Sequence, residues 1–277
     1  MNETNKIIQT FWTKPMNKSH LYLTMKMMYA SAKSIKKQGY DLVLYTDALG
    51  SKIVKGFPYD DVVVLDIPDK VNPEMFAAIK YFALRNEELG TIHLDYDIII
   101  DKPCICPKDG WDVLVQMRHD EIVRYSKERK ILIENGTPSR MREIDLSMHP
   151  YCVGVIGFNN ESLKKEFIDN YFEAIDIYSN KNIRCTIDFL LEQSFLPSLV
   201  DKYGYRSDFV AEQKATNYKY PTDDKNIRYF CDEQIGFAHF HSKSKWTIPV
   251  INKISNMLTK DDNVLINENY KSAISLI

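Results

Sequence analysis

Segments suited to strands and to helices alternate along the first hundred residues, and no other feature of the sequence constrains the fold as strongly. The segments suited to strands are short apolar runs, at Ile7–Trp12, Asp41–Thr46, Val62–Leu65 and Thr91–Leu94. Helical segments are expected between them, at Lys18–Lys37 and from Asn72 to about Asn86. Strands that alternate with helices assemble into a sheet covered by helices. We therefore expect an α/β fold with a central mixed, mainly parallel sheet flanked by helices.

Local signals support the two helices. The first has apolar residues spaced by four, three, four and three positions, which is the pattern of an amphipathic helix: Leu21, Met25, Met28, Ala32 and Ile35. Gly39 is its expected stop. For the second helix, Asn72-Pro73-Glu74 predicts the start, because Asn caps free N–H groups and Pro suits the first turn.

The second half of the chain is less regular. Strands are expected at Trp111–Met117 and Tyr151–Phe158, and helices at Ser162–Tyr178 and Thr186–Leu196. The polar stretch 119–150 between the two strands has the character of an inserted flap. No repeat and no linker divides the chain, so we expect a single domain over residues 1–277.

Composition and charge exclude several classes of protein. The chain carries 36 Lys and Arg against 38 Asp and Glu, which argues against nucleic-acid binding. No run of about 18 apolar residues suits a membrane span, and the N-terminus lacks the pattern of a signal peptide. The five cysteines are scattered and form no paired metal motif, so reduced, mostly buried thiols and a cytoplasmic location are expected.

Asp95 and Asp97 form the strongest candidate for chemistry. They follow the apolar strand Thr91–Leu94 at positions i and i+2, where both carboxylates can point to one side. Ligands of open α/β sheets bind beyond the carboxyl ends of the strands, and carboxylate pairs suit Mg²⁺ or Mn²⁺. The alternative is a charged strand end exposed to water. We favour the metal site, because the preceding strand is apolar and several β-α units come before it.

A second candidate lies in the segment AHFHSKSKW near the C-terminus. His239 and His241 share one face of an extended segment, and Lys245 follows. A histidine can complete a metal site, with His239 as first choice and His241 as second, and a lysine can neutralise phosphate. An exposed polar strand end that leads into the last helix explains the segment equally well. Two Asp, one His and a Lys together suit stabilisation of a leaving diphosphate.

The D-x-D in IHLDYDIIID resembles that of nucleotide-sugar glycosyltransferases of GT-A fold. The likeness is greatest to the retaining family that contains glycogenin and bacterial lipopolysaccharide galactosyl- and glucosyltransferases. The segment HFHSKSKW is similar to that family's pattern H-x-x-G-x-x-K-P-W, with Ser242 in place of Gly and the Pro absent. Lys80 in AAIKYFALRN, the small-residue strand YCVGVIGF and the helix IDFLLEQSFL also resemble family features.

The resemblance implies a role for each matching residue. Asp95, Asp97 and His239 would hold Mn²⁺ or Mg²⁺, Lys245 would bind the diphosphate and Lys80 the nucleotide-sugar side. Further contacts to the nucleotide would come from Thr10, Thr13, Asp47 and Tyr96. Thr and Asp at strand ends are often caps or turn formers, which is the alternative for these residues.

Candidates for the sugar side lie in the helix expected at Thr186–Leu196. Glu192 and Gln193 would face the sugar, with Asp188 as a weaker candidate for the same role. The alternative for Glu192 and Gln193 is the solvated face of that helix.

The resemblance also implies a substrate class and a location. The donor would be a nucleotide sugar, UDP-hexose first, and the acceptor a glycan or lipid-linked molecule of bacterial polysaccharide synthesis. A nucleotide-binding half would span about 1–101 and an acceptor-side half 102–277. The enzyme would be cytoplasmic, with peripheral contact at the inner membrane face as an option, and its oligomeric state is not predicted.

Three alternatives stay open. A nucleotide-sugar binding module with a degenerate site would share the same motifs. A phosphatase of the haloacid dehalogenase type also uses D-x-D, but normally on its first strand. The apolar stripe in Pro249–Lys260 suits a membrane surface, although packing on the protein body is favoured.

Overall fold

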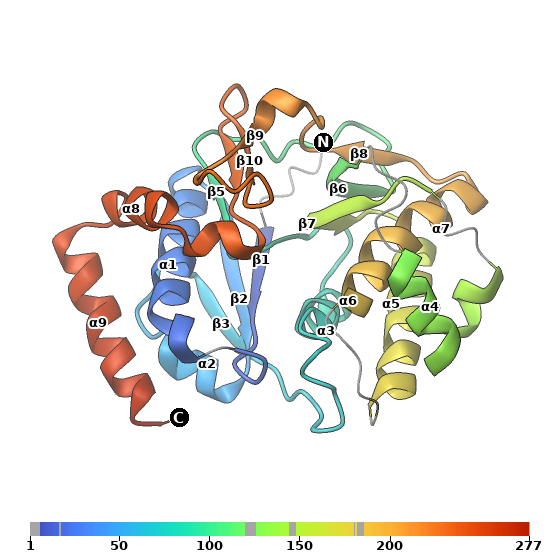
Figure 1. The fold of residues 1–277 in the computed structure, drawn as a ribbon, viewed down its shortest axis with the longest axis horizontal. Helices are drawn as coiled ribbons and strands as arrows, with labels where there is room; N and C mark the ends of the chain where they lie inside the picture. Colours follow the sequence, from blue (N-terminus) through green and yellow to red (C-terminus); the bar gives the residue numbers. More distant parts are fainter. Residues whose placement is uncertain are drawn as a thin grey trace. The chain divides into compact units, whose positions relative to one another are not determined.

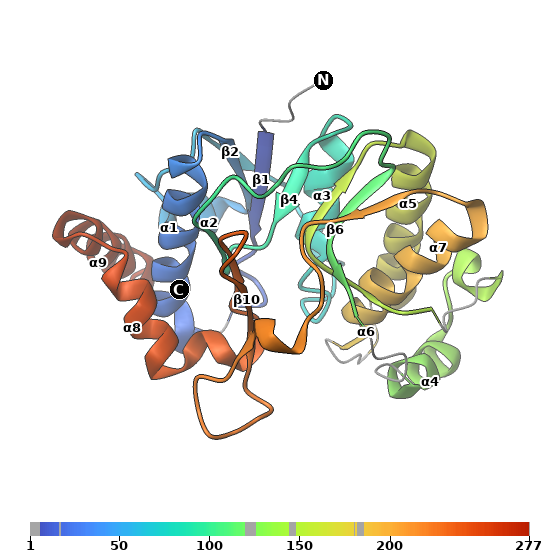
Figure 2. The same ribbon diagram turned by 90° about the horizontal axis from the view of Figure 1, so that it is seen from above.

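The computed structural model describes residues 6–16, 18–119, 126–143, 148–179, 181 and 186–276. The chain divides into two compact units, drawn in Figures 1 and 2. Unit 1 consists of Met1–Leu65, Leu94–Ile105 and Lys214–Ile277, and unit 2 consists of Asp66–His93 and Cys106–Gln213. Unit 1 therefore joins three distant stretches of the sequence, including both candidate motifs. The single domain expected from the sequence stays a prediction.

Three parallel strands run through unit 1, namely β1 (Lys6–Phe11), β2 (Asp41–Thr46) and β3 (Asp61–Val64). β2 pairs with β1 on one side and with β3 on the other. Most side chains of β1 and β2 are buried, as expected of strands covered on both faces. All three strands lie within one residue of the predicted ranges.

In the described part of unit 1 the α-helices are α1 (Leu21–Lys37), α2 (Ala48–Ile53), α8 (Ile248–Asn256) and α9 (Lys260–Ile274). A 3-10 turn, Lys18–His20, precedes α1, and Gly39 ends it with the positive φ of 84° that glycine tolerates. α8 and α9 both contact α1, so the C-terminal helices lie beside the first helix of the chain (Figure 1). A buried apolar cluster of unit 1 spans these helices and includes Met25, Leu44 and Ile254.

Unit 1 also holds a small antiparallel sheet. Its strands, in the order β5-β11-β10-β9, are β5 (Ile98–Ile100), β11 (Phe237–His239), β10 (Tyr229–Asp232) and β9 (Tyr218–Lys219). The extended segment at Ile98–Ile100 is confirmed. In this register His239 pairs with Ile98, directly after Asp97. The short 3-10 helices Ala215–Asn217 and Ser242–Trp246 flank the sheet in sequence.

The strands of unit 2 follow the order β4-β7-β6-β8, and the last residue of β4, Leu94, belongs to unit 1. They are β4 (Ile92–Leu94), β7 (Tyr151–Phe158), β6 (Val113–Arg118) and β8 (Ser207–Phe209). β6 pairs antiparallel with β7 and parallel with β8. Gly157 lets the backbones approach, because a Cβ there would lie 2.9 Å from Cγ1 of Ile92 and 3.2 Å from the Thr91 carbonyl.

Helices cover the strands of unit 2. They are α3 (Ala78–Asn86), α4 (Ser126–Asn135), the 3-10 helix Ser139–Glu143, α5 (Glu161–Tyr178), α6 (Thr186–Phe189), the π-helix Leu190–Ser194 and α7 (Phe195–Tyr203). α5 contacts α3, α7 and β7. Asn160 caps α5, its side chain accepting from the Leu163 N–H at 3.1 Å.

The expected α/β fold with a mixed sheet and flanking helices is confirmed, with one local correction. The helix predicted from Asn72 begins only at Ala78. Asn72 accepts from the Glu74 N–H and donates to the carbonyls of Tyr178 and Lys181, so it forms a turn instead of a cap. In the predicted flap, residues 120–125 and 144–147 lie outside the described residues, and α4 and a 3-10 helix form in the rest.

Two findings concern membranes and thiols. Within the described ranges, the helices are too short or too polar to cross a bilayer. Cys152 and Cys231 are buried free thiols, as expected, whereas Cys106 is exposed and Cys104 partly exposed, which corrects the expectation for that pair. Cys185 lies outside the described residues.

Candidate metal centre

The two aspartates of the D-x-D motif lie on the tight turn that joins β4 to β5. The Ile98 N–H donates to the Asp95 carbonyl at 3.1 Å and closes this turn. The buried Gln9 amide of β1 also donates to that carbonyl, at 3.4 Å. The turn is thus anchored to the first strand of unit 1.

His239 reaches the same turn through strand pairing. It is the last residue of β11, which lies antiparallel to β5. The Phe240 N–H donates to the Asp97 carbonyl at 3.0 Å, so the pairing continues one residue into the turn. Backbone hydrogen bonds therefore place the histidine beside the D-x-D motif.

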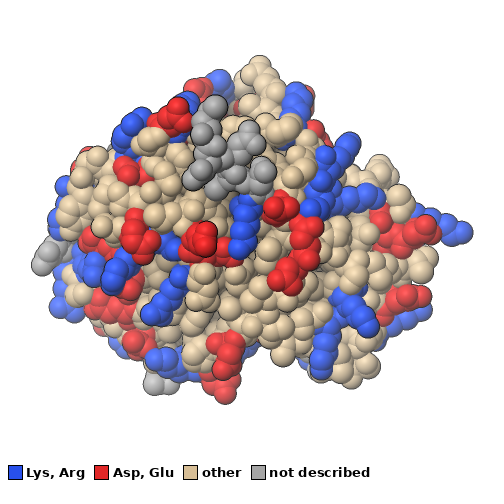
Figure 3. All heavy atoms as spheres, turned by 180° about the vertical axis from the view of Figure 1, so that it is seen from behind, with Lys and Arg blue, Asp and Glu red and all other residues tan. Residues whose placement is uncertain are grey.

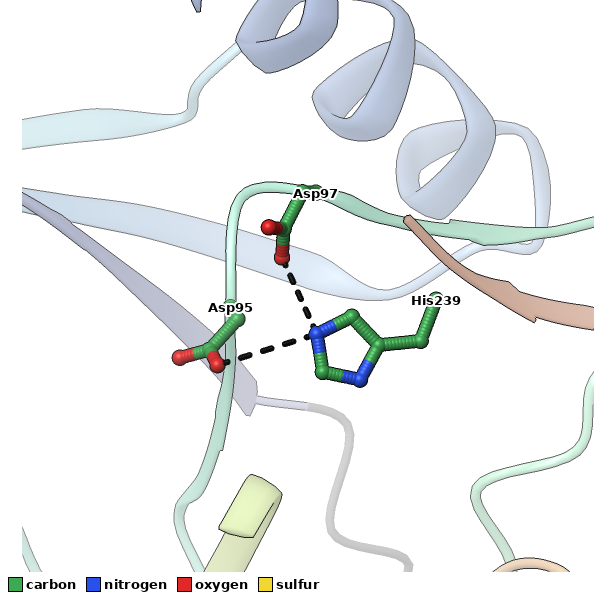
Figure 4. Close-up of side chains that lie close together, drawn as sticks. All are labelled: Asp95, Asp97 and His239. Atoms are coloured by element: carbon green, nitrogen blue, oxygen red, sulfur yellow. Dashed lines mark ion pairs between the residues drawn. The ribbon is translucent and has the colours of Figure 1, made fainter. Parts of the chain in front are cut away.

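The three side chains point toward one another (Figure 4). His239 Nε2 lies 3.2 Å from Asp97 Oδ1 and 4.0 Å from Asp95 Oδ2. The three groups offer ligand atoms that all lie within 4.8 Å of one another. Asp97 and His239 are buried, whereas the Asp95 side chain is 33% exposed. Two carboxylate oxygens and one imidazole nitrogen at this spacing fit a divalent ion such as Mn²⁺ or Mg²⁺.

Lys245 occupies the other side of Asp97. Its Nζ donates to Asp97 Oδ2 at 2.9 Å. The same ammonium lies 5.2 Å from the ring centre of Tyr96 and 5.4 Å from that of Trp246, both distances typical of cation–π contacts. The predicted phosphate-binding lysine is thus held against a predicted metal ligand.

The charges of this group support one another. Burial alone would raise the pKa of Asp97, but Lys245 and His239 hold that pKa far below its usual range. Burial alone would lower the pKa of Lys245, but the Asp97 carboxylate raises that pKa above its ordinary value. Both groups are therefore charged at neutral pH.

His241 lies next to the centre without joining it. Its ring is 5.1 Å from the ring of His239, and its Nδ1 lies 3.3 Å from the His239 carbonyl. Among the residues that the structure describes, the cluster of metal-type ligands contains Asp95, Asp97 and His239 but not His241. Its role as a second-choice ligand stays a prediction.

Thr13 and Asp47 come together at the ends of β1 and β2. Asp47 Oδ2 accepts from the Thr13 N–H at 3.1 Å and from the Thr13 hydroxyl at 2.5 Å. Its Oδ1 caps α2 by accepting from the Gly50 N–H at 2.8 Å. This is the turn-forming and capping arrangement that the sequence left as an alternative. Thr10 is buried in β1. Nucleotide contact by these residues stays a prediction.

Two further predicted residues, Lys80 and Glu192, meet inside unit 2, away from solvent. Lys80 Nζ lies 3.1 Å from Glu192 Oε1 and 3.2 Å from the Val153 carbonyl, and both side chains are less than 7% exposed. The Tyr81 hydroxyl donates to the same Glu192 oxygen at 2.7 Å. Glu192 lies in the π-helix, and its burial excludes the solvated helix face that was its alternative. Gln193, next to it, is partly exposed.

Asp188 is fully buried one turn before Glu192. It accepts from the Ala77 N–H at 3.0 Å and from the Tyr171 hydroxyl. Burial and the nearby Glu192 carboxylate raise the pKa of Asp188 well above its ordinary value. The sequence pointed to neither Tyr81 nor Tyr171, although Tyr81 directly follows the singled-out Lys80.

The profile of the family of unknown function DUF6734 matches residues 5–273. The chain belongs to this family. The family's description states no activity, so the activity of the chain is a proposal. No curated protein matches the sequence.

Solved glycosyltransferase structures resemble the chain at a distance. Mouse xyloside xylosyltransferase 1 matches with 10% identity and a TM-score of 0.43, over 74% of this chain and 84% of that one. The galactosyltransferase LgtC, solved with donor and acceptor sugar analogues, matches with 11% identity and a TM-score of 0.47, over 92% and 96%. An active-site mutant of LgtC gives a TM-score of 0.44 at 11% identity, over the same shares. Likeness at this level does not identify an activity.

Proposed function

We propose that this chain is a metal-dependent glycosyltransferase of GT-A-like fold, which transfers a hexose from a nucleotide sugar to a glycan or lipid-linked acceptor. The observation that carries the proposal is the convergence of Asp95, Asp97 and His239, with Lys245 on the same carboxylate. Two carboxylates, an imidazole and an ammonium are the groups needed to hold a metal and a diphosphate together. UDP-hexose as donor rests on the motif resemblance.

Each side chain of the centre has a proposed task. Asp95, Asp97 and His239 would hold Mn²⁺ or Mg²⁺, which supplies positive charge to the oxygens of a leaving diphosphate. Lys245 would neutralise a phosphate as a point charge, with the rings of Tyr96 and Trp246 beside its ammonium. Asp47, by fixing the Thr13 backbone and hydroxyl, would position the loop after β1 for the nucleotide.

The buried group of unit 2 would serve the sugar side of the reaction. Lys80 and Tyr81 hold one oxygen of Glu192, so the direction of that carboxylate is fixed. The π-helix that carries Glu192 is a rare element found often at functional sites. We propose Glu192 as the leading sugar-side residue, with Gln193 and Asp188 after it.

The charges on one face agree with a substrate other than nucleic acid. On the face shown in Figure 3, Lys and Arg side chains are interspersed with Asp and Glu and form no continuous basic stripe. Proteins that bind nucleic acid normally present such a stripe. A small anionic donor held at a local centre fits this distribution better. We propose cytoplasmic action on a glycan or on a lipid-linked acceptor at a membrane surface.

One observation favours a second candidate, a nucleotide-sugar binding module without turnover. Both oxygens of Asp97 already have charged or polar partners, Lys245 and His239. Because Lys245 and His239 already neutralise the Asp97 carboxylate, this centre does not require a metal for its own charge balance. The protein could then bind the donor's phosphates through Lys245 without a catalytic metal. The two candidates therefore differ in whether a divalent metal is needed.

A thermal-shift screen tests the proposal. UDP-glucose, UDP-galactose and other nucleotide sugars are added with and without MnCl₂, and the melting temperature is recorded. A ligand that binds only the folded state raises the midpoint. The glycosyltransferase proposal expects a shift with at least one donor that grows when Mn²⁺ is present. A shift that is independent of Mn²⁺ would support the binding module, and no shift with any donor would contradict both.

A further inference from the structure

Lys245 lies close to a position that a divalent metal would also need. Its ammonium donates to Asp97 Oδ2 at 2.9 Å, while His239 Nε2 lies 3.2 Å from Oδ1 of the same carboxylate. The Lys245 side chain is only 16% exposed, so water screens its charge weakly. A cation bound by Asp95, Asp97 and His239 would share one carboxylate with a buried ammonium. The metal ion and the Lys245 ammonium would repel each other, because both are positively charged and both would contact Asp97.

Besides Asp97, two aromatic rings hold the Lys245 ammonium. Tyr96 and Trp246 contact the ammonium through their rings, and such contacts are weaker than an ion pair. The lysine also lines a hollow in unit 1, together with Leu23, Lys26, Met27, Ile251 and Ile254 of α1 and α8. This hollow has room for only about one water molecule and already holds the like-charged Lys26, so it is no alternative seat for the ammonium. The flexible four-carbon stem of Lys245 would instead let the ammonium leave Asp97 toward a bound anion.

We propose that Lys245 is an internal competitor for the metal at Asp97, which lowers the affinity for a divalent ion until an anionic ligand draws the lysine away. The anion, a nucleoside diphosphate, rests on the proposed function; the competition itself rests on the contacts of Lys245. Metal and diphosphate would then strengthen each other's binding. Such coupling is reciprocal, so each ligand raises the affinity for the other by the same factor.

The experiment measures Mn²⁺ binding directly, by isothermal titration calorimetry with MnCl₂ as the only ligand. The proteins are the unaltered chain, the variant Lys245→Met, which keeps the stem and removes the charge, and the control Lys243→Met. Lys243 is an exposed lysine in the same 3-10 helix. We expect Lys245→Met to bind Mn²⁺ about tenfold tighter or more, and Lys243→Met to bind it as the unaltered protein does. Circular dichroism checks the fold, and Lys245→Gln replaces the Met variant if that variant does not fold.

A second titration adds UDP at saturation. The proposal expects UDP to raise the Mn²⁺ affinity of the unaltered chain, and to raise it less in Lys245→Met. Equal or weaker Mn²⁺ binding by Lys245→Met, or no Mn²⁺ binding by any of the proteins, would overturn the competition. Neither titration measures sugar transfer. A chain that shows the competition but cleaves no nucleotide sugar would refute the proposed function and leave this inference standing. A chain that cleaves a nucleotide sugar but shows no competition would refute this inference and leave the proposed function standing.

Discussion

The Lys80 ammonium lies 3.1 Å from Oε1 of Glu192 in the interior of unit 2, with both side chains less than 7% exposed. A buried ion pair contributes little net stability, but loss of one partner leaves an uncompensated charge in a medium of low dielectric. We therefore infer that the main effect of this ion pair is to fix the direction of the Glu192 carboxylate. It also makes unit 2 sensitive to changes at either residue.

Lys80→Met should lower the free energy of unfolding by about 3–5 kcal/mol, because it leaves the Glu192 carboxylate buried without its cation. The double variant Lys80→Met/Glu192→Gln should recover most of that loss, since no buried charge remains. Urea denaturation measures both. Lys70→Met is the matched control: its partner Asp176 and Lys70 itself are 66% and 60% exposed, so less than about 1 kcal/mol should be lost. If the losses of unfolding free energy caused by Lys80→Met and by Glu192→Gln alone simply add in the double variant, the two residues do not interact and the ion pair is contradicted.

Strands that contain a continuous apolar run could be located from the sequence. β2 and β7 were predicted to the residue, at Asp41–Thr46 and Tyr151–Phe158, because polar residues or turns bound each buried run. The strands β9 and β10 were not predicted. They have two and four residues. β10 pairs with β11 and β9 pairs with β10, and the local sequence does not reveal this pairing.

The candidate site could be predicted in part. Residue type and spacing pointed to Asp95, Asp97 and His239, and β5–β11 pairing places them together. The contact of Lys245 with Asp97 joins residues 148 positions apart and depends on packing, so no local pattern contains it. The local sequence also did not predict the burial of Glu192. A π-helix changes the angle between successive side chains, so the ordinary helical period misplaces the face that they share.

Glu192→Gln should reduce sugar transfer by about a hundredfold or more, if the carboxylate acts on the sugar as proposed. The amide has nearly the same shape and can still accept from the Tyr81 hydroxyl, but it leaves the buried Lys80 ammonium without its anion. A stability loss of about 3–5 kcal/mol is therefore expected, and activity is compared at a temperature where circular dichroism shows both proteins folded. Mn²⁺ binding should be unchanged, because the metal ligands belong to unit 1. Glu88→Gln, at an exposed position of unit 2, serves as the control. Full activity of Glu192→Gln would remove Glu192 from the reaction.

Asp262 should make the stability of α9 depend on pH. It accepts from Lys33, Tyr29 and the Thr259 N–H, and it completes a capping box with Thr259. Burial would raise its pKa, but Lys33 and these hydrogen bonds lower that pKa well below the ordinary value. A lowered folded-state pKa stabilises the protein above the unfolded pKa of about 4, and this stabilisation is lost as the pH falls further.

Asp262→Asn should therefore cost about 1–2 kcal/mol at pH 7, and the difference from the unaltered protein should shrink below about pH 4. Thermal melts across pH 3–8 measure both values. The neighbouring Asp261 is exposed, so Asp261→Asn should change little at any pH. A difference that stays constant down to pH 3 would contradict the account of Asp262.

Asp97→Asn should abolish turnover while leaving the fold nearly intact. The amide keeps the shape of the carboxylate, but it loses the charge that attracts both a divalent cation and Lys245. The stability cost should stay within about 1–3 kcal/mol, since the partners lose one buried charge-assisted contact. Asp101→Asn is the control, because Asp101 is exposed and close in sequence.

The most direct test of the central claim is cleavage of radiolabelled UDP-hexose, measured as released hexose or transferred label. The account predicts cleavage or transfer by the unaltered chain with Mn²⁺, and loss of both after chelation of the metal or in Asp97→Asn, with Asp101→Asn fully active. Turnover that survives chelation, or an active Asp97→Asn variant, would contradict a metal-dependent glycosyltransferase centred on Asp95, Asp97 and His239.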